Sequence, residues 1–299
     1  MGFLQLQEPS GLVWSWTDIT SDLYCGKVVG ATRGVSVFSY VLWLAILLLL
    51  AASFYPRERR MLIGAVGWWV FSLHWLLQPS HYVAIADWYN VGVTLGAAVL
   101  CALLGYLMFE HYRGHTHLNQ STLLTLTAAC AIGGVAYFPF AQLELLHTAL
   151  KGMVSSQTVW LVGLLGHSAT LVSPCNIEIQ GFEIEIVLAC TAIESMALFT
   201  GLILAVDAPV IRKLKALLIS VPVIYVLNLF RNAFVCIATG YLWFSHDPYE
   251  SFYIAHAVLA KVGSTLALIV IAYAVLKLLP ELLDVIDEFV SFIIRRIRA

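Results

Sequence analysis

The sequence predicts an all-α polytopic membrane protein, with about seven transmembrane helices, a small extracellular β-hairpin and amphipathic helices. Of its 299 residues, 61% are hydrophobic and 11% are charged, less than half the roughly 25% charged residues of an ordinary soluble domain. The mean hydropathy is +0.87. So few charges do not cover the surface of a soluble domain of this length, which excludes the soluble, disordered and fibrous classes.

The transmembrane helices are predicted from long apolar runs, because about 20 apolar residues span the hydrocarbon core of a bilayer. These runs lie at residues 35–55, 61–77, 91–109, 120–138, 187–206, 215–240 and 256–279. Residues 153–172 are a weaker candidate, because Ser, Gln, Gly and His residues dilute the run. The runs show no alternation with a period of two, so a membrane β-barrel is not expected.

Basic residues orient these helices, because cytoplasmic loops carry an excess of Lys and Arg. The basic clusters are Arg57, Arg59 and Arg60; Arg212, Lys213 and Lys215; and Arg295, Arg296 and Arg298. All three clusters fall on the cytoplasmic side only if residues 153–172 do not span the membrane. We therefore expect an extracellular N-terminus, a cytoplasmic C-terminus, and an interfacial or re-entrant helix at 153–172.

Two shorter patterns complete the predicted fold. Residues 176–186 alternate polar and apolar side chains around Gln180-Gly181, which predicts a two-stranded hairpin, or flap, directly before Cys190. Residues 281–298 place apolar side chains on one helical face, with acidic residues early and arginines late, which is typical of an interfacial helix. The expected parts are an extracellular or interfacial segment 1–34, a membrane domain 35–279 and a cytoplasmic tail 280–299.

Ionisable groups inside a membrane are costly and usually functional. The predicted spans contain few of them: Cys190, Glu194, Arg231, His256 and Lys261. From a helical rise of about 1.5 Å per residue, Cys190 lies about 5 Å below the outer end of its span. A long arginine side chain extends toward water. We therefore expect a thiol, a guanidinium and an imidazole from three helices to meet just under the outer surface.

Together, Cys190, Arg231 and His256 suit the chemistry of a cysteine peptidase or transpeptidase. A thiol attacks only as a thiolate, which a neighbouring cation favours. The Arg231 guanidinium is suited to stabilise the oxyanion formed by attack on a carbonyl. His256 is suited to protonate the leaving amine.

Each of these residues also has a structural interpretation. A single membrane cysteine is usually a small core residue, and a single histidine is often only packed. Arg231, flanked by Asn228 and Asn232, requires either a function or a buried ion pair. The two asparagines are therefore candidates for a supporting or substrate-binding role.

Glu194 and Lys261 are further supporting candidates. Glu194 lies one predicted helical turn after Cys190, on the same face. It is expected either to neutralise Arg231 or Lys261 or to take part in the site.

Three other kinds of protein are alternatives to a cysteine enzyme. A transporter, with Arg231, Glu194 and Lys261 lining a pathway, predicts polar residues distributed toward the cytoplasmic side, whereas these residues cluster near one face. A metal enzyme would use His111, His115 and His117, which lie in a short loop at the opposite, cytoplasmic end. A rhomboid-like serine site at residues 166–168 lacks the usual elbow pattern. No cofactor, metal or nucleic-acid partner is expected.

Three sequence blocks resemble those of the exosortase/archaeosortase family, in the family's order and on successive predicted spans. They are LACTAIESMALFTG at 188–201, PVIYVLNLFRN at 222–232 and HAVLAKVG at 256–263. The resemblance is strongest over residues 170–275, and upstream it lies mainly in hydropathy.

The resemblance implies that Cys190 is the nucleophile and Arg231 a catalytic residue. It gives His256 as the third, basic residue, a position that is His in many members and Arg in others. It implies that the substrates are exported proteins with a C-terminal Pro-Gly-Phe-type motif, a membrane helix and a basic tail. It also implies cleavage near the motif, transfer of the new carboxyl end to a membrane lipid, and an archaeal cell membrane.

Cys25 and Cys175 are both predicted to lie outside the cell, where disulfides persist. A bridge between them would tie the N-terminal segment to the base of the flap. Sequence spacing does not determine whether they are close enough to pair, so a bridge and two free thiols both stay open.

Overall fold

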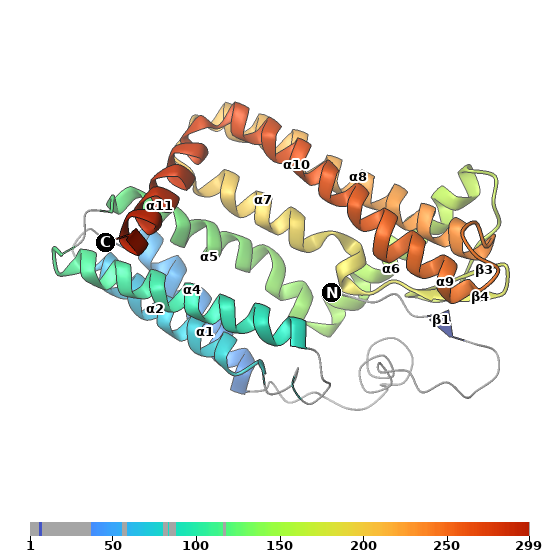
Figure 1. Cartoon of the computed structure of the whole chain (residues 1–299), viewed down its shortest axis with the longest axis horizontal. Coiled ribbons are helices and arrows are strands. Elements are labelled where there is room, and N and C mark those ends of the chain that lie inside the picture. The colour runs from blue at the N-terminus through green and yellow to red at the C-terminus, as the bar shows by residue number, and fades with distance from the viewer. Residues whose placement is uncertain are drawn as a thin grey trace. The chain divides into compact units, whose positions relative to one another are not determined.

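The chain forms two compact units, each assembled from separated segments. Unit 1 comprises Met1–Ala31, Tyr137–Met196 and Leu217–Val275, and unit 2 comprises Thr32–Ala136, Ala197–Ala216 and Leu276–Ala299. The structure is a computed structural model (Figure 1) that describes residues 6–7, 37–55, 59–79, 83, 88–115 and 118–298.

A helix is found at each apolar run that the sequence marks as a span. The helices are α1 (Val37–Phe54), α2 (Arg60–Leu76), α4 (Trp88–Tyr112), α5 (Gln120–Gln142), α6 (Glu144–Leu164), η1 (Leu188–Thr191), α7 (Ile193–Ala205), α8 (Val210–Gly240), α9 (Pro248–Phe252), η2 (Tyr253–Ala260), α10 (Lys261–Leu278) and α11 (Pro280–Arg298). Among the described residues, three helical stretches are long and apolar enough to cross a membrane: Asn90–Tyr112, Gln120–Gln142 and Pro248–Leu278. Ser39–Phe54 and Ile193–Ala205 are shorter apolar helices, so the count of seven spans stays a prediction.

In unit 2, α2 packs against both α1 and α4, and the three helices lie side by side (Figure 1). Glycines allow the close approach: a Cβ on Gly105 of α4 would lie 3.0 Å from the Ala65 carbonyl oxygen of α2. The Ser72 hydroxyl of α2 donates to the Ala98 carbonyl of α4 at 2.8 Å. Small residues and buried hydroxyl bonds are the usual means by which membrane helices associate.

Unit 1 contains a four-stranded antiparallel sheet in the order β1-β4-β3-β2. The strands are β1 (Leu6–Gln7), β2 (Thr170–Ser173), β3 (Asn176–Ile179) and β4 (Phe182–Glu185). Strands β3 and β4 pair about Gln180 and Gly181, whose φ angles of 52° and 81° suit a two-residue hairpin turn. The predicted flap has two strands, whereas the observed sheet has four, because β2 pairs with β3 on one edge and β1 pairs with β4 on the other.

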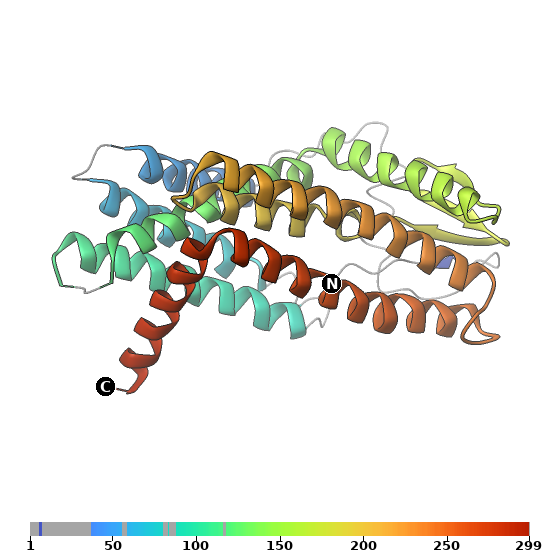
Figure 2. The same ribbon diagram turned by 90° about the horizontal axis from the view of Figure 1, so that it is seen from above.

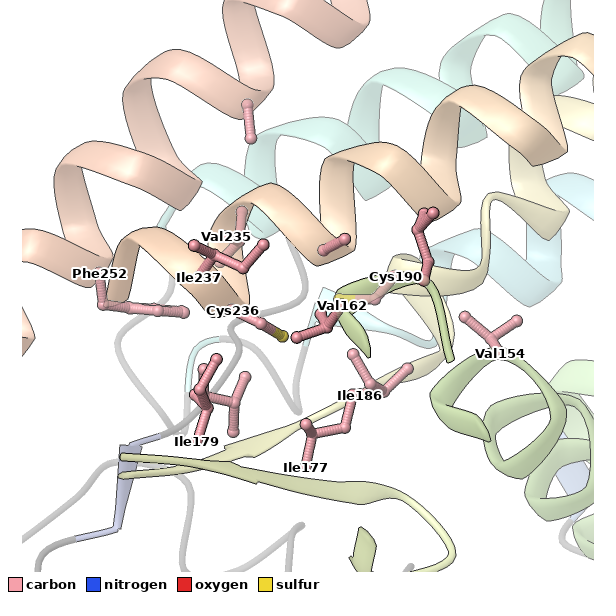
Figure 3. Packing of buried hydrophobic residues seen from close by; sticks show 14 of the residues in the cluster. Val154, Val162, Ile177, Ile179, Ile186, Cys190, Val235, Cys236, Ile237 and Phe252 are labelled. Atoms are coloured by element: carbon pink, nitrogen blue, oxygen red, sulfur yellow. The ribbon is translucent and has the colours of Figure 1, made fainter. Parts of the chain in front are cut away.

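The apolar face of the hairpin is buried against α8. Figure 3 shows Ile177, Ile179 and Ile186 pointing from the strands toward Cys236, and their exposed fractions are 0–1%. A Cβ on Gly240, at the end of α8, would lie 2.8 Å from Ile179, so the glycine permits this contact. The sheet thus packs against the helix that carries Arg231.

Helix α6 lies beside the sheet (Figure 2) and also packs against η1. It begins at Glu144 and ends at Leu164, so the predicted helix at 153–172 is wrong in its second half. The chain turns at Gly166, whose φ of 83° suits the residue that follows a helix. Residues 170–173 then form β2, because their pairing with β3 overrides the apolar character of the run.

The C-terminal segment forms α11, which is amphipathic as predicted for residues 281–298. Leu282 is 3% exposed, and Arg212 Nη1 donates to Glu281 Oε2 at 3.0 Å. The Thr122 hydroxyl of α5 hydrogen-bonds Glu288. These contacts all lie within unit 2, so α11 is anchored to that unit by polar groups.

Candidate functional site

Cys190 lies in the short 3₁₀ turn η1 rather than inside a transmembrane helix, which corrects the continuous span predicted at 187–206. Its N–H donates to the Val187 carbonyl at 2.8 Å. Ala192 has a φ of 59°, a left-handed conformation that is uncommon for a residue other than Gly and interrupts the helix. Helix α7 begins only at Ile193. The nucleophile candidate is therefore held on a turn between the sheet and α7, where it is 1% exposed.

The backbone of Cys190 is fixed by two side chains of α8. Asn228 Nδ2 donates to the Cys190 carbonyl oxygen at 2.7 Å, and Asn232 Nδ2 donates to the same oxygen at 2.9 Å. The two asparagines are four residues apart and so share one helical face. Both are buried, with exposed fractions of 8% and 1%. They bind the protein's own main chain, and their supporting role stays a prediction.

Arg231 connects Cys190 to His256. Its guanidinium lies near enough to the Cys190 thiol to act on it electrostatically, and its Nη2 lies 3.3 Å from His256 Nδ1. Its Nη1 donates to Asn232 Oδ1 at 3.3 Å. The structure thus brings together the three side chains that the sequence proposes as catalytic.

The contact with Arg231 determines the state of the His256 ring. A guanidinium has donors and no acceptor, so Nδ1 of His256 must accept. The tautomer that makes this hydrogen bond is the neutral one with its proton on Nε2. A neutral imidazole is a base, and it becomes able to give a proton to a leaving group only after it has taken one up.

His256 is placed by a π-helical segment that the sequence does not indicate. It lies in η2, is 4% exposed, and stacks on Phe252 with ring centroids 5.2 Å apart and 12° between the planes. One wider turn inside an α-helix rotates the residues that follow it, and such turns are frequent at functional sites. The turn thus sets which face of the helix carries His256 and which carries Lys261.

Glu194 does not share a helical face with Cys190, because the left-handed Ala192 separates the two residues. Its carboxylate is exposed and accepts from the Tyr137 hydroxyl at 3.3 Å. Lys261 is half-buried at the start of α10 and lines a cavity.

The cavity has a volume of about 710 Å³, within the roughly 300–1,000 Å³ typical of ligand pockets. The residues around it come from unit 1 and are mainly apolar, among them Leu227, Phe230 and Leu268. Arg231 and Lys261 supply positive charge, and Ala189, the neighbour of Cys190, forms part of the wall. The cavity therefore offers an apolar volume with cations beside the nucleophile candidate.

Sequence reasoning missed two charged residues near Cys190. Lys151 of α6 is 1% exposed, and its Nζ lies 3.1 Å from Glu185 Oε1 of β4. Both residues lie outside the predicted spans, so hydropathy does not indicate that they are buried. The polar alternation of the hairpin also makes Glu185 look solvent-exposed. The sequence indicates the burial of Lys151 only by its place among apolar residues, between Leu150 and Val154.

The alternative sites gain no geometric support. The described part of the chain holds no group of three or more His, Cys, Asp or Glu side chains able to bind a metal. His115 Nδ1 lies 3.9 Å from a carboxylate oxygen of Glu110, and His117 lies outside the described residues. His167, in the proposed serine site, packs its ring against Tyr241 at 4.6 Å.

The cysteines fall into two classes. Cys101, Cys130, Cys190 and Cys236 are free, whereas Cys175 is disulfide-bonded. Cys25, whose pairing with Cys175 the sequence leaves open, lies outside the described residues.

Comparison with known proteins identifies relatives over most of the chain. Residues 33–260 match the family model described as transmembrane exosortase. Archaeosortase A of Haloferax volcanii is 33% identical over 265 residues, which cover 78% of this chain and 85% of that protein. Archaeosortase A of Natronomonas pharaonis is 31% identical over 263 residues, covering 79% and 80%. No solved structure matches. The resemblance drawn from the three sequence blocks is confirmed.

Proposed function

The chain belongs to the transmembrane exosortase family, and from this premise we propose that it is a membrane-embedded cysteine transpeptidase or protease. Membership of this family supports a location in the membrane and a role in processing the sorting signals of other proteins. The proposed substrates are exported surface proteins that end in a Pro-Gly-Phe-type motif, a membrane helix and a basic tail. The proposed acceptor is a membrane lipid, and no cofactor is required.

The observation that carries this proposal is the contact of Arg231 with both Cys190 and His256. On substrate binding, the Arg231 guanidinium turns to the carbonyl oxygen on which negative charge develops. This movement frees His256 Nδ1, which takes the proton of the Cys190 thiol. The sulfur then forms a bond to the carbonyl carbon. This single movement of the Arg231 side chain thus provides the donor to the oxyanion and frees His256 to act as the base.

The remaining steps return the site to its starting state. The C–N bond breaks as His256 gives its proton to the leaving amine, which leaves a thioester on Cys190. A lipid headgroup nucleophile then gives a proton to His256 and attacks the thioester. The Cys190 thiolate leaves and regains that proton. Because Asn228 and Asn232 hold the Cys190 carbonyl throughout, the sulfur keeps its position between the two half-reactions.

The cavity beside Arg231 is the proposed binding site for the reacting segment. Its apolar walls suit a chain that leaves a membrane helix, and Arg231 and Lys261 suit an anionic group. The proposed topology has seven spans, the site near the extracellular face, the hairpin as an extracellular flap, and the C-terminus in the cytoplasm. The proposed parts are the segment 1–34, the catalytic membrane domain 35–279 and the tail 280–299. The transporter alternative gains no support from relatives that are named archaeosortases.

Substitution of each free cysteine tests the nucleophile. Cys190→Ala is expected to insert in the membrane and to process no substrate, because no other group at the site can form a thioester. Cys101→Ala, Cys130→Ala and Cys236→Ala are matched controls. Cys236 is the strictest of them, because it is free, 1% exposed and packed in the same cluster. Normal processing by Cys190→Ala refutes the mechanism.

The mass of the mature C-terminus tests the acceptor. Purified enzyme is incubated with a substrate peptide in defined lipid vesicles, and the product is measured by mass spectrometry. A product that carries the mass of a lipid supports transfer. A free carboxylate in every lipid tested leaves a protease and removes the transferase part of the proposal.

A further inference from the structure

The ion pair between Lys151 and Glu185 is buried more deeply than such pairs normally are. The two side chains are 2% and 11% exposed, and Lys151 Nζ lies 3.1 Å from Glu185 Oε1. Lysine is almost never fully buried unless it is paired. Around it, Leu150 and Val154 of the same helix belong to an apolar cluster.

A buried pair of this kind is weak evidence for stability. The free energy lost when two charges leave water is about as large as the free energy gained from their attraction. Well-packed apolar side chains in their place commonly stabilise a core at least as much as the ion pair does. The apolar neighbours show that this core accepts such side chains. The presence of the pair is therefore better explained by what it positions.

The pair holds the segment of chain that leads into Cys190. Glu185 ends β4, and the next residue, Ile186, donates its N–H to the Cys175 carbonyl at 2.8 Å. Val187 then accepts from the Cys190 N–H. Helix α6, which carries Lys151, packs against both the sheet and η1. Lys151 thus binds this segment on one side, while the asparagines of α8 bind it on the other.

The charge of Lys151 also reaches the thiol. Together with Arg231, it acts electrostatically on Cys190. The two cations differ in one respect. Arg231 hydrogen-bonds His256 and is half-exposed at the cavity, whereas Lys151 is enclosed and tied to Glu185.

We propose that Lys151 is a positioning residue for Cys190: held by Glu185, it fixes the chain before η1 and keeps a positive charge behind the sulfur. This inference rests on the proposed function, in which Arg231 leaves the thiol for the oxyanion. Lys151 then remains as the cation that favours the thiolate.

The experiment measures how fast Cys190 is alkylated, which requires no substrate. Full-length protein in detergent is treated with iodoacetamide between pH 6 and 10, and the Cys190 peptide is quantified by mass spectrometry. The other charged or titratable groups near this region stay unchanged in every variant: Arg231 and Cys236 of α8, His256 of η2 and His147 of α6.

Lys151→Met/Glu185→Met removes both charges and leaves no unpaired buried ion, so it is expected to fold. We expect its alkylation profile to move about one pH unit upward, which lowers the rate about tenfold at neutral pH. Lys151→Arg keeps the charge and is expected to keep the wild-type profile. A wild-type profile in the double variant, or the same slow profile in Lys151→Arg, overturns the inference.

A second variant gives the result if the double variant does not fold. Lys151→Gln/Glu185→Gln removes both charges and keeps two polar side chains that can hydrogen-bond each other, so we expect the same slower alkylation together with slower turnover. Alkylation of this variant at the wild-type rate contradicts the inference. Failure of the proposed function is seen separately, as processing by Cys190→Ala, and leaves the alkylation result standing.

Discussion

Removing the two asparagine amides that hold Cys190 should damage activity more than the two single losses combined. With Asn228→Ala or Asn232→Ala alone, the Cys190 carbonyl oxygen keeps one of its two side-chain donors. Loss of one hydrogen bond costs about 1 kcal/mol, which is about fivefold in kcat/KM. Asn232→Ala should be the more harmful change, because Asn232 also accepts from Arg231.

The double variant loses both side-chain donors to a buried oxygen. Independent losses would add to about 2 kcal/mol, or roughly 30-fold in kcat/KM. Leaving the buried acceptor without these partners adds about 1–3 kcal/mol. We therefore expect Asn228→Ala/Asn232→Ala to lose about 3–5 kcal/mol, which is more than 100-fold in kcat/KM.

The assay compares kcat/KM for the wild type, both single variants and the double variant on one sorting-signal peptide in detergent. Thermal unfolding of each protein is recorded beside it. Asn119→Ala is the matched control, because it removes an exposed hydrogen bond in unit 2 that the Ser121 N–H donates to Asn119 Oδ1. A double variant no worse than the product of the single effects refutes the argument, because the carbonyl would then not depend on these donors.

Three further outcomes are expected. Arg231→Lys should lose most activity, because an ammonium cannot replace a planar fork of donors that bonds His256 and can reach the oxyanion. Turnover near that of the wild type would make Arg231 a neutralising charge only. Gly201→Ala should lower the stability of unit 2 by about 1–3 kcal/mol, because its Cβ would lie 2.9 Å from the Gly133 backbone nitrogen. Gly96→Ala is the control, because a Cβ there meets open space and should leave thermal unfolding unchanged. The hydrogen bonds from Arg212 hold the pKa of Glu281 below its ordinary value of 4.5, so their contribution to stability is complete above pH 4.5 and is lost as the pH falls through the lowered pKa. Glu281→Gln should therefore reduce the loss of stability at acid pH in a pH series of unfolding measurements. An unchanged dependence on pH would contradict a stabilising role for this ion pair.

The sequence was most informative where structure depends on neighbours along the chain. The turn at Gln180-Gly181 and the pairing of β3 with β4 follow from alternation and from a glycine, which tolerates a positive φ. The face of α11 follows from a helical period. These patterns are local, so they survive whatever packs around them. Pairing between distant segments is different, and β1, which pairs with β4 from the other end of the chain, was missed for this reason. The strand β2 pairs with its neighbour β3 and was missed because its apolar run also suits a helix.

The candidate site shows the same division. Cys190, Arg231 and His256 were identified because ionisable side chains in apolar runs are rare, and because three sequence blocks resemble one family. Lys151 and Glu185 were not identified, because each is ordinary in its own segment. Their pairing exists only because α6 packs against the end of β4.

The sequence by itself determined the class of protein, the location of its helices, the hairpin and the candidates for the reactive side chains. Hydropathy and periodicity are summed along the chain, and these features depend on nothing else. Only the tertiary structure decided that Cys190 lies on a turn, that two asparagines hold its carbonyl, and that the neutral His256 ring accepts from Arg231. The physical reason is that hydrogen bonds and ion pairs are short-range, so they are set by angstrom-scale contacts between elements that are distant in the chain.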